Sequence, residues 1–187
     1  MAAALFVYFG NFGVVSWAGG SIIFHASHPT VRESIVNESR IIRVEHAWDR
    51  FAEIQELYYS VLYRGWGVPR GADWYHDANG SVFAVALGTE DRLMGAARLL
   101  PAPGDRSRQI RQVAVAADAH GAGLGRRLMW DLEALALDQG ASELWLHSRS
   151  SAYGFYQRLG FIPEGDEFDS ELTGIRHTTM RKPLQSS

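Results

Sequence analysis

Cysteine is absent from this sequence, and its absence excludes several kinds of chemistry at once. The chain can form no disulfide, has no thiol nucleophile and offers no thiolate ligand to a metal. A chain without disulfides suits a reducing compartment, and we expect a cytoplasmic protein. The seven histidines show no HExxH pattern and no other convincing ligand spacing, so we also predict that no metal is bound.

An excess of positive charge is missing too. The formal net charge of −3 argues against the strongly basic face that nucleic-acid-binding proteins usually present, and we predict no nucleic-acid partner. The length of 187 residues, 47% of them hydrophobic, suits one globular domain with its own core and a short appendage. The oligomeric state stays open, with a homodimer among the alternatives.

Charged side chains are missing from residues 1–31. Residues 1–24 are long enough to cross a bilayer, but glycine, asparagine and serine divide them into short apolar runs, and no basic residue lies near Met1. Three interpretations follow: a membrane anchor, short strands joined by glycine turns, or residues read from a start codon set too far upstream. We favour the last two. Residues 1–40 are accordingly an apolar extension and linker of unknown role, and residues 41–187 form the main domain.

Hydrophobic periodicity in the main domain predicts the element order β-α-β-β-β-α-β-α-β-β. The expected strands cover residues 41–44, 81–87, 92–100, 110–115, 142–147, 161–163 and 176–180. The expected helices cover residues 48–63, the segment from 124 to a stop at Gly140, and 152–159. Such an order is typical of an α/β domain with a layered, mixed sheet.

The stretch from Ile110 to Gly140 combines a strand, a glycine turn and an amphipathic helix in direct succession. Along the strand, the period-2 pattern assigns Ile110, Gln112 and Ala114 to one face and Arg111, Val113 and Val115 to the other. The first amide groups of the helix have no intrahelical partner, and glycines would let an anion approach them. The turn contains glycine at 121, 123 and 125, with Arg126 and Arg127 following. We favour an anion site over the alternative of a tight turn that needs glycine only for its dihedral angles.

Two kinds of phosphate site fit this segment poorly. A kinase-type phosphate loop requires Lys and Ser or Thr after its last glycine, where Arg126 and Arg127 stand. A dinucleotide fold requires G-x-G-x-x-G and an acidic residue after the next strand, but the spacing here is G-x-G-x-G and that strand ends at His147.

The strand Val113-Ala114-Val115 followed by His120-Gly121-Ala122-Gly123-Leu124-Gly125-Arg126 resembles the coenzyme A-binding motif of the GNAT family of N-acetyltransferases. That motif reads Arg/Gln-x-x-Gly-x-Gly/Ala after a Val-Ala-Val strand, and His120 here stands where the family usually has Arg or Gln. The resemblance implies the GNAT fold, a central mixed β-sheet with helices on both faces. It also implies acetyl-CoA as co-substrate, with its pyrophosphate on the amides of residues 121–126 and its pantetheine arm paired with residues 113–115.

A second segment, residues 152–161, resembles the downstream Phe-Tyr-x-x-Leu-Gly-Phe motif of the same family. In that motif a tyrosine lies beside the coenzyme sulfur, and the matching residue is Tyr156, which the resemblance implies as the proton donor to the leaving thiolate. The alternative is that Tyr156 only packs with Phe155 and Phe161. Arg149 stands where many relatives have an asparagine, seven residues before the tyrosine.

The acceptor amine must lose a proton before it attacks. Candidate proton acceptors are Glu143, His147, Asp169 and Glu171, or a water leading to one of them. We include His147 as a catalytic candidate because its pKa is near neutrality by nature, although a lone histidine in a strand is more often structural.

The tail, with its Gly-Ile-x-His-x-x-Met pattern at residues 174–180, resembles the ElaA-type branch of the family. We expect an acidic loop at residues 166–171 that faces Trp66 and Trp74 and attracts a cationic small amine. In that hypothesis the substrate-binding residues are Trp66, Trp74, Asp169 and Glu171. The alternatives are a solvated acidic turn and tryptophans that only cover a core edge.

Taken together, these motifs predict an acetyl-CoA-dependent N-acetyltransferase. It would move the acetyl group directly to a primary amine of a small molecule or peptide in a ternary complex. The alternative is a non-catalytic acyl-CoA-binding module of the same fold that acts as a sensor or binds a partner protein.

Overall fold

The computed structural model describes residues 38–70, 79–101 and 106–185, together with the backbone of three strands in residues 1–37. Those strands, β1 (Val7–Tyr8), β2 (Val14–Ala18) and β3 (Ser21–His25), pair antiparallel in a sheet of their own. They fall on the apolar runs of the extension, where the strand interpretation places them. The domain boundary between residues 40 and 41 stays a prediction. No helix in the described ranges is long and apolar enough to cross a bilayer.

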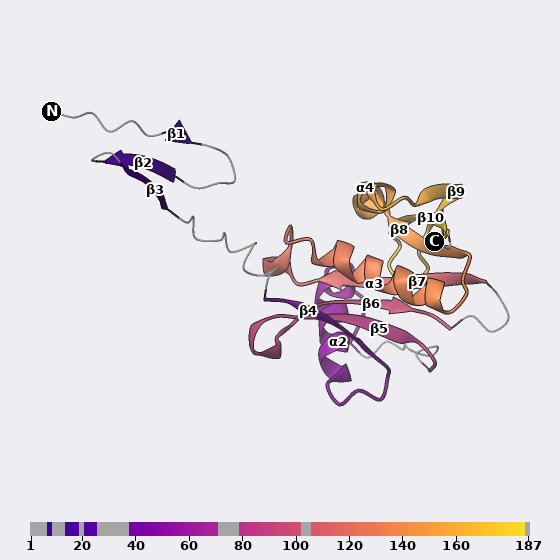
Figure 1. The fold of residues 1–187 in the computed structure, drawn as a ribbon. Coiled ribbons are helices and arrows are strands. Elements are labelled where there is room, and N and C mark those ends of the chain that lie inside the picture. The colour runs from indigo at the N-terminus through magenta and orange to yellow at the C-terminus, as the bar shows by residue number, and fades with distance from the viewer. Residues whose placement is uncertain are drawn as a thin grey trace.

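The main sheet has seven strands in the order β4-β5-β6-β7-β8-β10-β9 (Figure 1). All neighbouring strands are antiparallel except β7 and β8, which run parallel because helix α3 (Leu124–Asp138) crosses between them. The α/β fold class with a mixed sheet is therefore confirmed. The strands are β4 (Arg40–Val44), β5 (Val82–Leu87), β6 (Leu93–Leu99), β7 (Ser107–Val115), β8 (Glu143–Arg149), β9 (Ile162–Asp169) and β10 (Arg176–Pro183).

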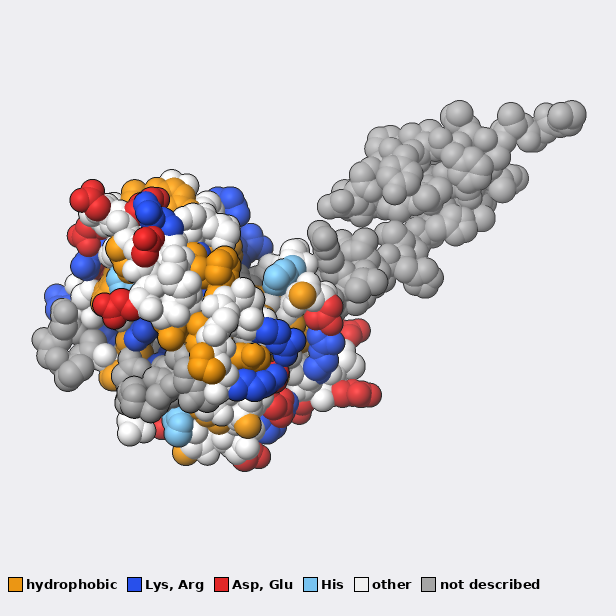
Figure 2. All heavy atoms as spheres, turned by 180° about the vertical axis from the view of Figure 1, so that it is seen from behind, with side chains coloured by type: hydrophobic (Ala, Val, Ile, Leu, Met, Phe, Trp, Pro, Cys, Tyr) orange, Lys and Arg blue, Asp and Glu red, His pale blue; other side chains and the backbone are white. Residues whose placement is uncertain are grey.

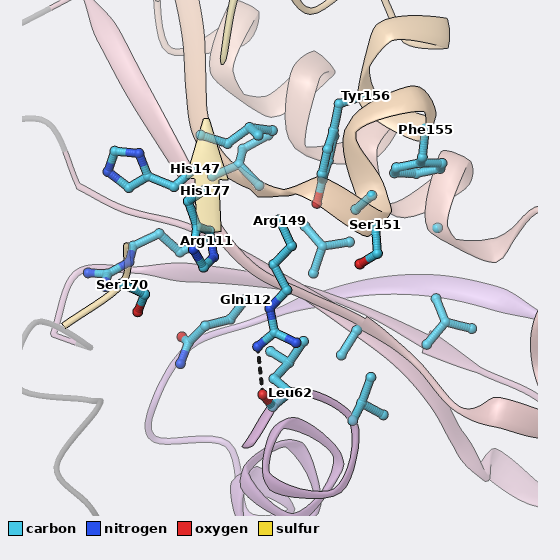
Figure 3. Close-up of a pocket in the computed structure, with 18 of the residues that line it drawn as sticks. Leu62, Arg111, Gln112, His147, Arg149, Ser151, Phe155, Tyr156, Ser170 and His177 are labelled. Atoms are coloured by element: carbon cyan, nitrogen blue, oxygen red, sulfur yellow. Dashed lines mark hydrogen bonds between the residues drawn. The ribbon is translucent and has the colours of Figure 1, made fainter. Parts of the chain in front are cut away.

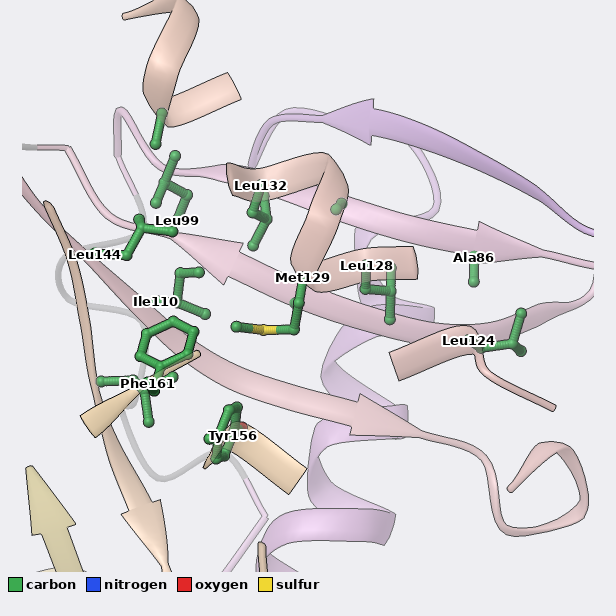
Figure 4. Packing of buried hydrophobic residues seen from close by; sticks show 14 of the residues in the cluster. Ala86, Leu99, Ile110, Leu124, Leu128, Met129, Leu132, Leu144, Tyr156 and Phe161 are labelled. Atoms are coloured by element: carbon green, nitrogen blue, oxygen red, sulfur yellow. The ribbon is translucent and has the colours of Figure 1, made fainter. Parts of the chain in front are cut away.

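Helices cover both faces of this sheet, and strand β5 shows how. Alternate residues of a strand point to opposite faces, so Phe83, Val85 and Leu87 pack with helix α2 (Phe51–Tyr58) while Ala84 and Ala86 pack with α3. Helix α4 (Tyr153–Arg158) joins the α3 side of the sheet through Tyr156 (Figure 4). The larger cluster on that side consists of α3 residues such as Leu128, Met129 and Leu132 together with Leu99, Ile110, Leu144 and Phe161.

The bounds of most elements shift by a few residues from the sequence prediction, those of the first helix and of strand β9 among them. The first helix begins at Phe51 rather than residue 48, and it widens into a π-helical turn, Tyr59–Tyr63. Strand β9 continues to Asp169, six residues beyond the predicted end at Pro163, so Asp166 and Asp169 belong to a strand and not to a loop. Every residue of β9 is exposed, and the strand forms through backbone pairing with β10, which leaves no buried-face pattern in the sequence.

Candidate active site

The parallel strands β7 and β8 separate partway along their length. Their pairing covers three positions and ends at Gln109 and Trp145. Beyond that point a cavity of about 1110 Å³ opens, and residues of the unpaired strand ends, from Ile110 to Val115 and from Leu146 to Arg149, contribute to its lining. Its size exceeds the usual range for small-molecule sites, so it is large enough for an extended ligand and a second molecule. Other lining residues come from α4, from residues 170–173 and from the π-helical turn Tyr59–Tyr63, which forms the end of the α2 segment.

A β-bulge at Gln112 shapes the wall that β7 contributes. Gln112 has a φ of 53°, and Gln112 and Val113 together lie opposite the single residue Ala97 of β6. Because the bulge inserts one residue, Ile110 packs on the α3 side of the sheet whereas Ala114 packs on the α2 side. The period-2 assignment of Ile110 and Ala114 to one face is therefore wrong.

Buried polar contacts hold the bulge in place. The side-chain oxygen of Gln112 accepts a hydrogen bond of 3.3 Å from Arg98, and its amide nitrogen donates one of 3.1 Å to the hydroxyl of Tyr63. Arg98 is fully buried and also donates to Ser81 at 3.1 Å. The bulge is thus connected to β5, β6 and the end of the α2 segment.

Beyond the bulge, β7 presents a backbone edge to the cavity. Ala116 donates its N–H to Met94 of β6, so the N–H and C=O groups of the preceding residue, Val115, point to the opposite edge. The contact between His120 Nε2 and the carbonyl oxygen of Val115, at 2.8 Å, agrees with this direction. Val113, Ala114 and Val115 all line the cavity, which places the predicted pantetheine-binding strand along it.

The glycine turn leads directly into α3. Gly121 and Gly123 both have a φ of 78°, a conformation that other residues adopt at a cost. Gly123 is the N-cap of α3 and no side chain caps this helix end. The first free amides, those of Leu124, Gly125 and Arg126, therefore have no intrahelical acceptor. A methyl group added at Gly125 would meet the Phe155 ring at 3.3 Å, so glycine also permits the close approach of α4.

The residues of this turn do not all reach the cavity. His120, Gly121, Gly123, Leu124, Gly125 and Arg126 line it, but Ala122 does not and is buried in the core. The two arginines after the turn also differ. The guanidinium of Arg126 lies 4.8 Å from the ring centroid of the exposed Trp130, whereas Arg127 binds the hydroxyl and carbonyl groups of Ser39. Arg127 thus connects α3 to the segment before β4, and Arg126 is the arginine that lines the cavity beside the glycine turn.

Tyr156 lies where α4 meets the cavity. Its ring packs between Phe155 and Phe161, at centroid distances of 5.0 and 6.0 Å, and the residue is 8% exposed. Burial raises the pKa of its phenol well above the ordinary value, and the positive charge of Arg149 acts in the opposite direction. Figure 3 shows the hydroxyl end of Tyr156 directed toward Arg149. Tyr156 therefore packs with Phe155 and Phe161 and also lines the cavity.

His147 also lines the cavity, on the opposite face of β8 from the buried Leu146. Its ring contacts Trp145 and Phe168, and its Nδ1 atom lies 3.2 Å from the hydroxyl of Thr179. Burial lowers the pKa of His147, and the charges of His177 and Arg111 lower it further. A neutral imidazole is thereby favoured, as a proton acceptor requires.

Sequence reasoning did not select His177, which lines the same cavity. It lies directly opposite Arg149 in the pairing of β10 with β8. Its Nδ1 atom is 2.8 Å from the carbonyl oxygen of Ile175, and because a carbonyl can only accept, Nδ1 carries the proton. In the neutral ring, Nε2 is then free of a proton. The Gly-Ile-x-His pattern of the tail was the available signal for this residue.

The residues predicted to bind the acceptor do not gather as expected. Glu171 lines the cavity, but Asp169 and Trp66 are not among its lining residues. Asp169 pairs with Arg176 at 2.9 Å, and Trp66 is 52% exposed. Trp74 falls outside the described residues. Glu143, a candidate base, pairs with Arg181 at 2.5 Å and is absent from the cavity lining.

Basic residues of β10 also pair with two other acidic side chains of β9. Glu167 lies 3.5 Å from Arg176, and Glu164 pairs with Arg181. In Figure 2 acidic and basic side chains are interspersed over this edge, at the upper left. Two arginines are thus shared among these carboxylates, so they offset part of the negative charge on which the acidic-loop hypothesis depends.

The sequence profile of the Acetyltransferase (GNAT) family matches residues 48–161, more than half of the chain. A candidate acetyltransferase of Bacillus subtilis is 38% identical over 65 residues, which cover 35% of this chain and 43% of that protein. YyaT of the same organism is 36% identical over 62 residues, covering 33% of this chain and 40% of YyaT. The matches therefore span less than half the length of these curated relatives.

Solved structures share the fold over most of their length. A candidate N-acetyltransferase from Lactobacillus plantarum has a TM-score of 0.68 at 24% identity, covering 80% of this chain and 100% of that chain. Escherichia coli ElaA has a TM-score of 0.65 at 19% identity, covering 77% of this chain and 99% of that chain. At these identities the similarity concerns the fold, and it confirms the GNAT-type architecture expected from the motifs.

Proposed function

Because the chain belongs to the Acetyltransferase (GNAT) family, we propose that it is an acetyl-CoA-dependent N-acetyltransferase acting on a primary amine of a small molecule. Both substrates bind together in this proposal, and the acetyl group moves directly from sulfur to nitrogen. One observation carries it: the glycine turn, the unpaired edge of β7 and Tyr156 all line the same cavity.

The chain's own groups fit the coenzyme. The free amides at the start of α3 and the guanidinium of Arg126 suit a pyrophosphate, because a helix N-terminus carries partial positive charge. The edge of β7 from Val113 to Val115 suits the amide groups of the pantetheine arm, which would add to the sheet as a strand does. Acetyl-CoA is a substrate in this account and supplies the activated thioester.

The proposed reaction needs three proton transfers. The amine loses one proton to a base and attacks the thioester carbonyl, so that the C–N bond forms as the C–S bond breaks. Tyr156 gives its phenolic proton to the departing thiolate and regains one that leaves the nitrogen. Burial raises the pKa of the Tyr156 phenol and so makes it a weaker acid, whereas the charge of Arg149 acts in the opposite direction by favouring the ionised tyrosine.

In this proposal the amine gives its proton to the imidazole of His147 or of His177. Both line the cavity on one face of the β8–β10 ladder, and each can act directly or through a water. His147 has a pKa lowered by burial, and His177 has an Nε2 atom that is unprotonated in the neutral ring.

A transfer assay tests the proposed function. Purified protein with acetyl-CoA and a panel of primary amines should release free thiol, and the acetylated amine should be detected by mass spectrometry. Acetyl-CoA alone should raise the melting temperature, because it binds the folded state. A rise in melting temperature without transfer to any amine would instead favour the non-catalytic acyl-CoA-binding module.

A further inference from the structure

The end of the cavity away from the glycine turn is rich in positive charge. Four arginines line the cavity, and Glu171 is the one carboxylate among the described lining residues. Arg126 lies at the turn itself, whereas Arg149 ends β8 and Arg111 lies just before the bulge. The four arginines are Arg111, Arg126, Arg149 and Arg158.

Arg149 is the most buried of these four arginines, since the other three are exposed. Within the described part of the chain, its guanidinium has no carboxylate partner. It donates one hydrogen bond, of 2.6 Å, to the carbonyl oxygen of Leu62 (Figure 3). It also lies 6.0 Å from the ring centroid of Trp66. Arg149 is half-buried, and burial lowers its pKa. A guanidinium has five N–H donors, so most of its hydrogen-bonding capacity is unused by the protein, while its desolvation is unfavourable.

Further positive charge lies close to Arg149. The charges of Arg111 and Arg149 both act on the pKa of Tyr63, and both oppose the effect of that residue's burial. Arg111 also acts on the pKa of His147, which lies on the same face of β8 as Arg149. The electrostatic field at the end of the cavity away from the glycine turn therefore favours an anion.

The phosphates of the coenzyme do not account for this charge. They are assigned to the turn at residues 121–126, whereas Arg111 lies four residues before Val115, roughly 13 Å along an extended strand. Arg149 is on the face of β8 opposite Leu144 and Leu146, which face the α3 side, and it reaches Leu62 at the end of the α2 segment. The guanidinium thus lies on the α2 side of the sheet, and the proposed reaction assigns this side to the acceptor.

We propose that the acceptor is an amino carboxylic acid, whose carboxylate binds the guanidinium of Arg149 beside Arg111. The inference rests on the proposed acetyl transfer to a primary amine and names the substrate class of that site. A carboxylate accepts two parallel hydrogen bonds from a guanidinium, which also orients the amine relative to the thioester. Polyamines, which lack an anion, are disfavoured by the same field.

The test compares each acid with its own amide. L-Amino acids and β-alanine are assayed against the corresponding amino acid amides, with polyamines included. The acids should have a kcat/KM about 10- to 100-fold above that of their amides, as expected for hydrogen bonds to charged groups. Arg149→Gln should remove this ratio, and Arg149→Lys should retain part of it. Arg92→Gln, which changes an exposed pair with Asp118 away from the cavity, is the matched control and should keep the full ratio.

A binding measurement separates failure of this inference from failure of the proposed function. Calorimetry on the protein saturated with coenzyme A should show tighter binding of an acid than of its amide in the wild type and in Arg92→Gln. That preference should be absent in Arg149→Gln, provided that circular dichroism shows this variant to be folded. Equal use or equal binding of acids and amides would overturn the inference, as would an unchanged ratio in Arg149→Gln. Preferential binding without any transfer would retain the anion site and reject the transferase.

Discussion

The side-chain amide of Gln112 donates a hydrogen bond of 3.1 Å to the hydroxyl of Tyr63 and so joins the bulge of β7 to the last residue of the π-helical turn. Gln112 has a positive φ, which is unfavourable for a residue with a Cβ atom. Its side chain is held from both sides, because Arg98 donates to the oxygen of the same amide. The contact couples strand β7 to the segment that contributes Leu62, the hydrogen-bond partner of Arg149.

Removal of the Tyr63 hydroxyl tests this coupling. In Tyr63→Phe the amide of Gln112 loses an acceptor, and we expect a loss of about 1 kcal/mol in unfolding free energy. The KM for the acceptor should rise more than the KM for acetyl-CoA, because the displaced segment contains Leu62, which holds the proposed carboxylate-binding Arg149. Chemical denaturation and steady-state kinetics measure the two effects. Equal changes in both KM values would show that the contact has only a general structural role.

The coenzyme site is tested by a pair of glycine substitutions. Gly123→Asp places a carboxylate at the N-terminus of α3, near Arg126, and should abolish the rise in melting temperature that acetyl-CoA causes. Gly140→Asp is the matched control, since Gly140 has the same φ of 78° and a side chain there would meet no atom within 4 Å. It should be destabilised to a similar degree yet still bind acetyl-CoA. Retained binding in Gly123→Asp would contradict the phosphate assignment.

The role of Tyr156 can be tested against a second tyrosine of helix α4, Tyr153. Tyr156→Phe should lower kcat roughly 100-fold or more with little change in coenzyme affinity, because only the proton donor is removed. Tyr153→Phe removes a hydroxyl three residues earlier, from a residue that packs against the core and does not line the cavity. It should have nearly normal kcat. If both variants retain kcat, water or another group protonates the thiolate.

The lowered pKa of His147 predicts a dependence on pH. Burial, His177 and Arg111 all favour the neutral ring, so its titration should occur below the ordinary value near 6.5. Since the folded state binds this proton less readily than the unfolded state, the associated stability is present above the ordinary pKa. It is lost as the pH falls through the lowered pKa.

Titration of the histidine Cε1–H signals by NMR measures this pKa directly. Arg111→Gln should raise the pKa of His147, because it removes one of the opposing charges. If His147 is the proton acceptor, the acidic limb of the kcat/KM profile should move to higher pH in the same variant. A shifted NMR titration with an unshifted profile would assign the proton acceptor to His177 or to water.

Much of the fold could be predicted from local patterns. The element order of the main domain is as expected, and α3 begins at Leu124, after a glycine turn, and ends shortly before Gly140. Apolar periodicity and glycine positions suffice for such elements because they depend on residues near in sequence. Strand β9 was largely missed for the opposite reason, since its formation depends on backbone pairing with β10.

The sequence by itself determined the family, the glycine turn at the start of α3 and the position of Tyr156, because these depend on residue types at short spacing. Only the tertiary structure decided on which face of the sheet each side chain of β7 lies. A single bulge at Gln112 reverses the alternation that a period-2 pattern assumes. The tertiary structure also decided the environment of Arg149, whose hydrogen-bond partner Leu62 is 87 residues away. No local pattern contains such a contact, because it exists only after the separated strands β7 and β8 and the end of the α2 segment have come together around one cavity.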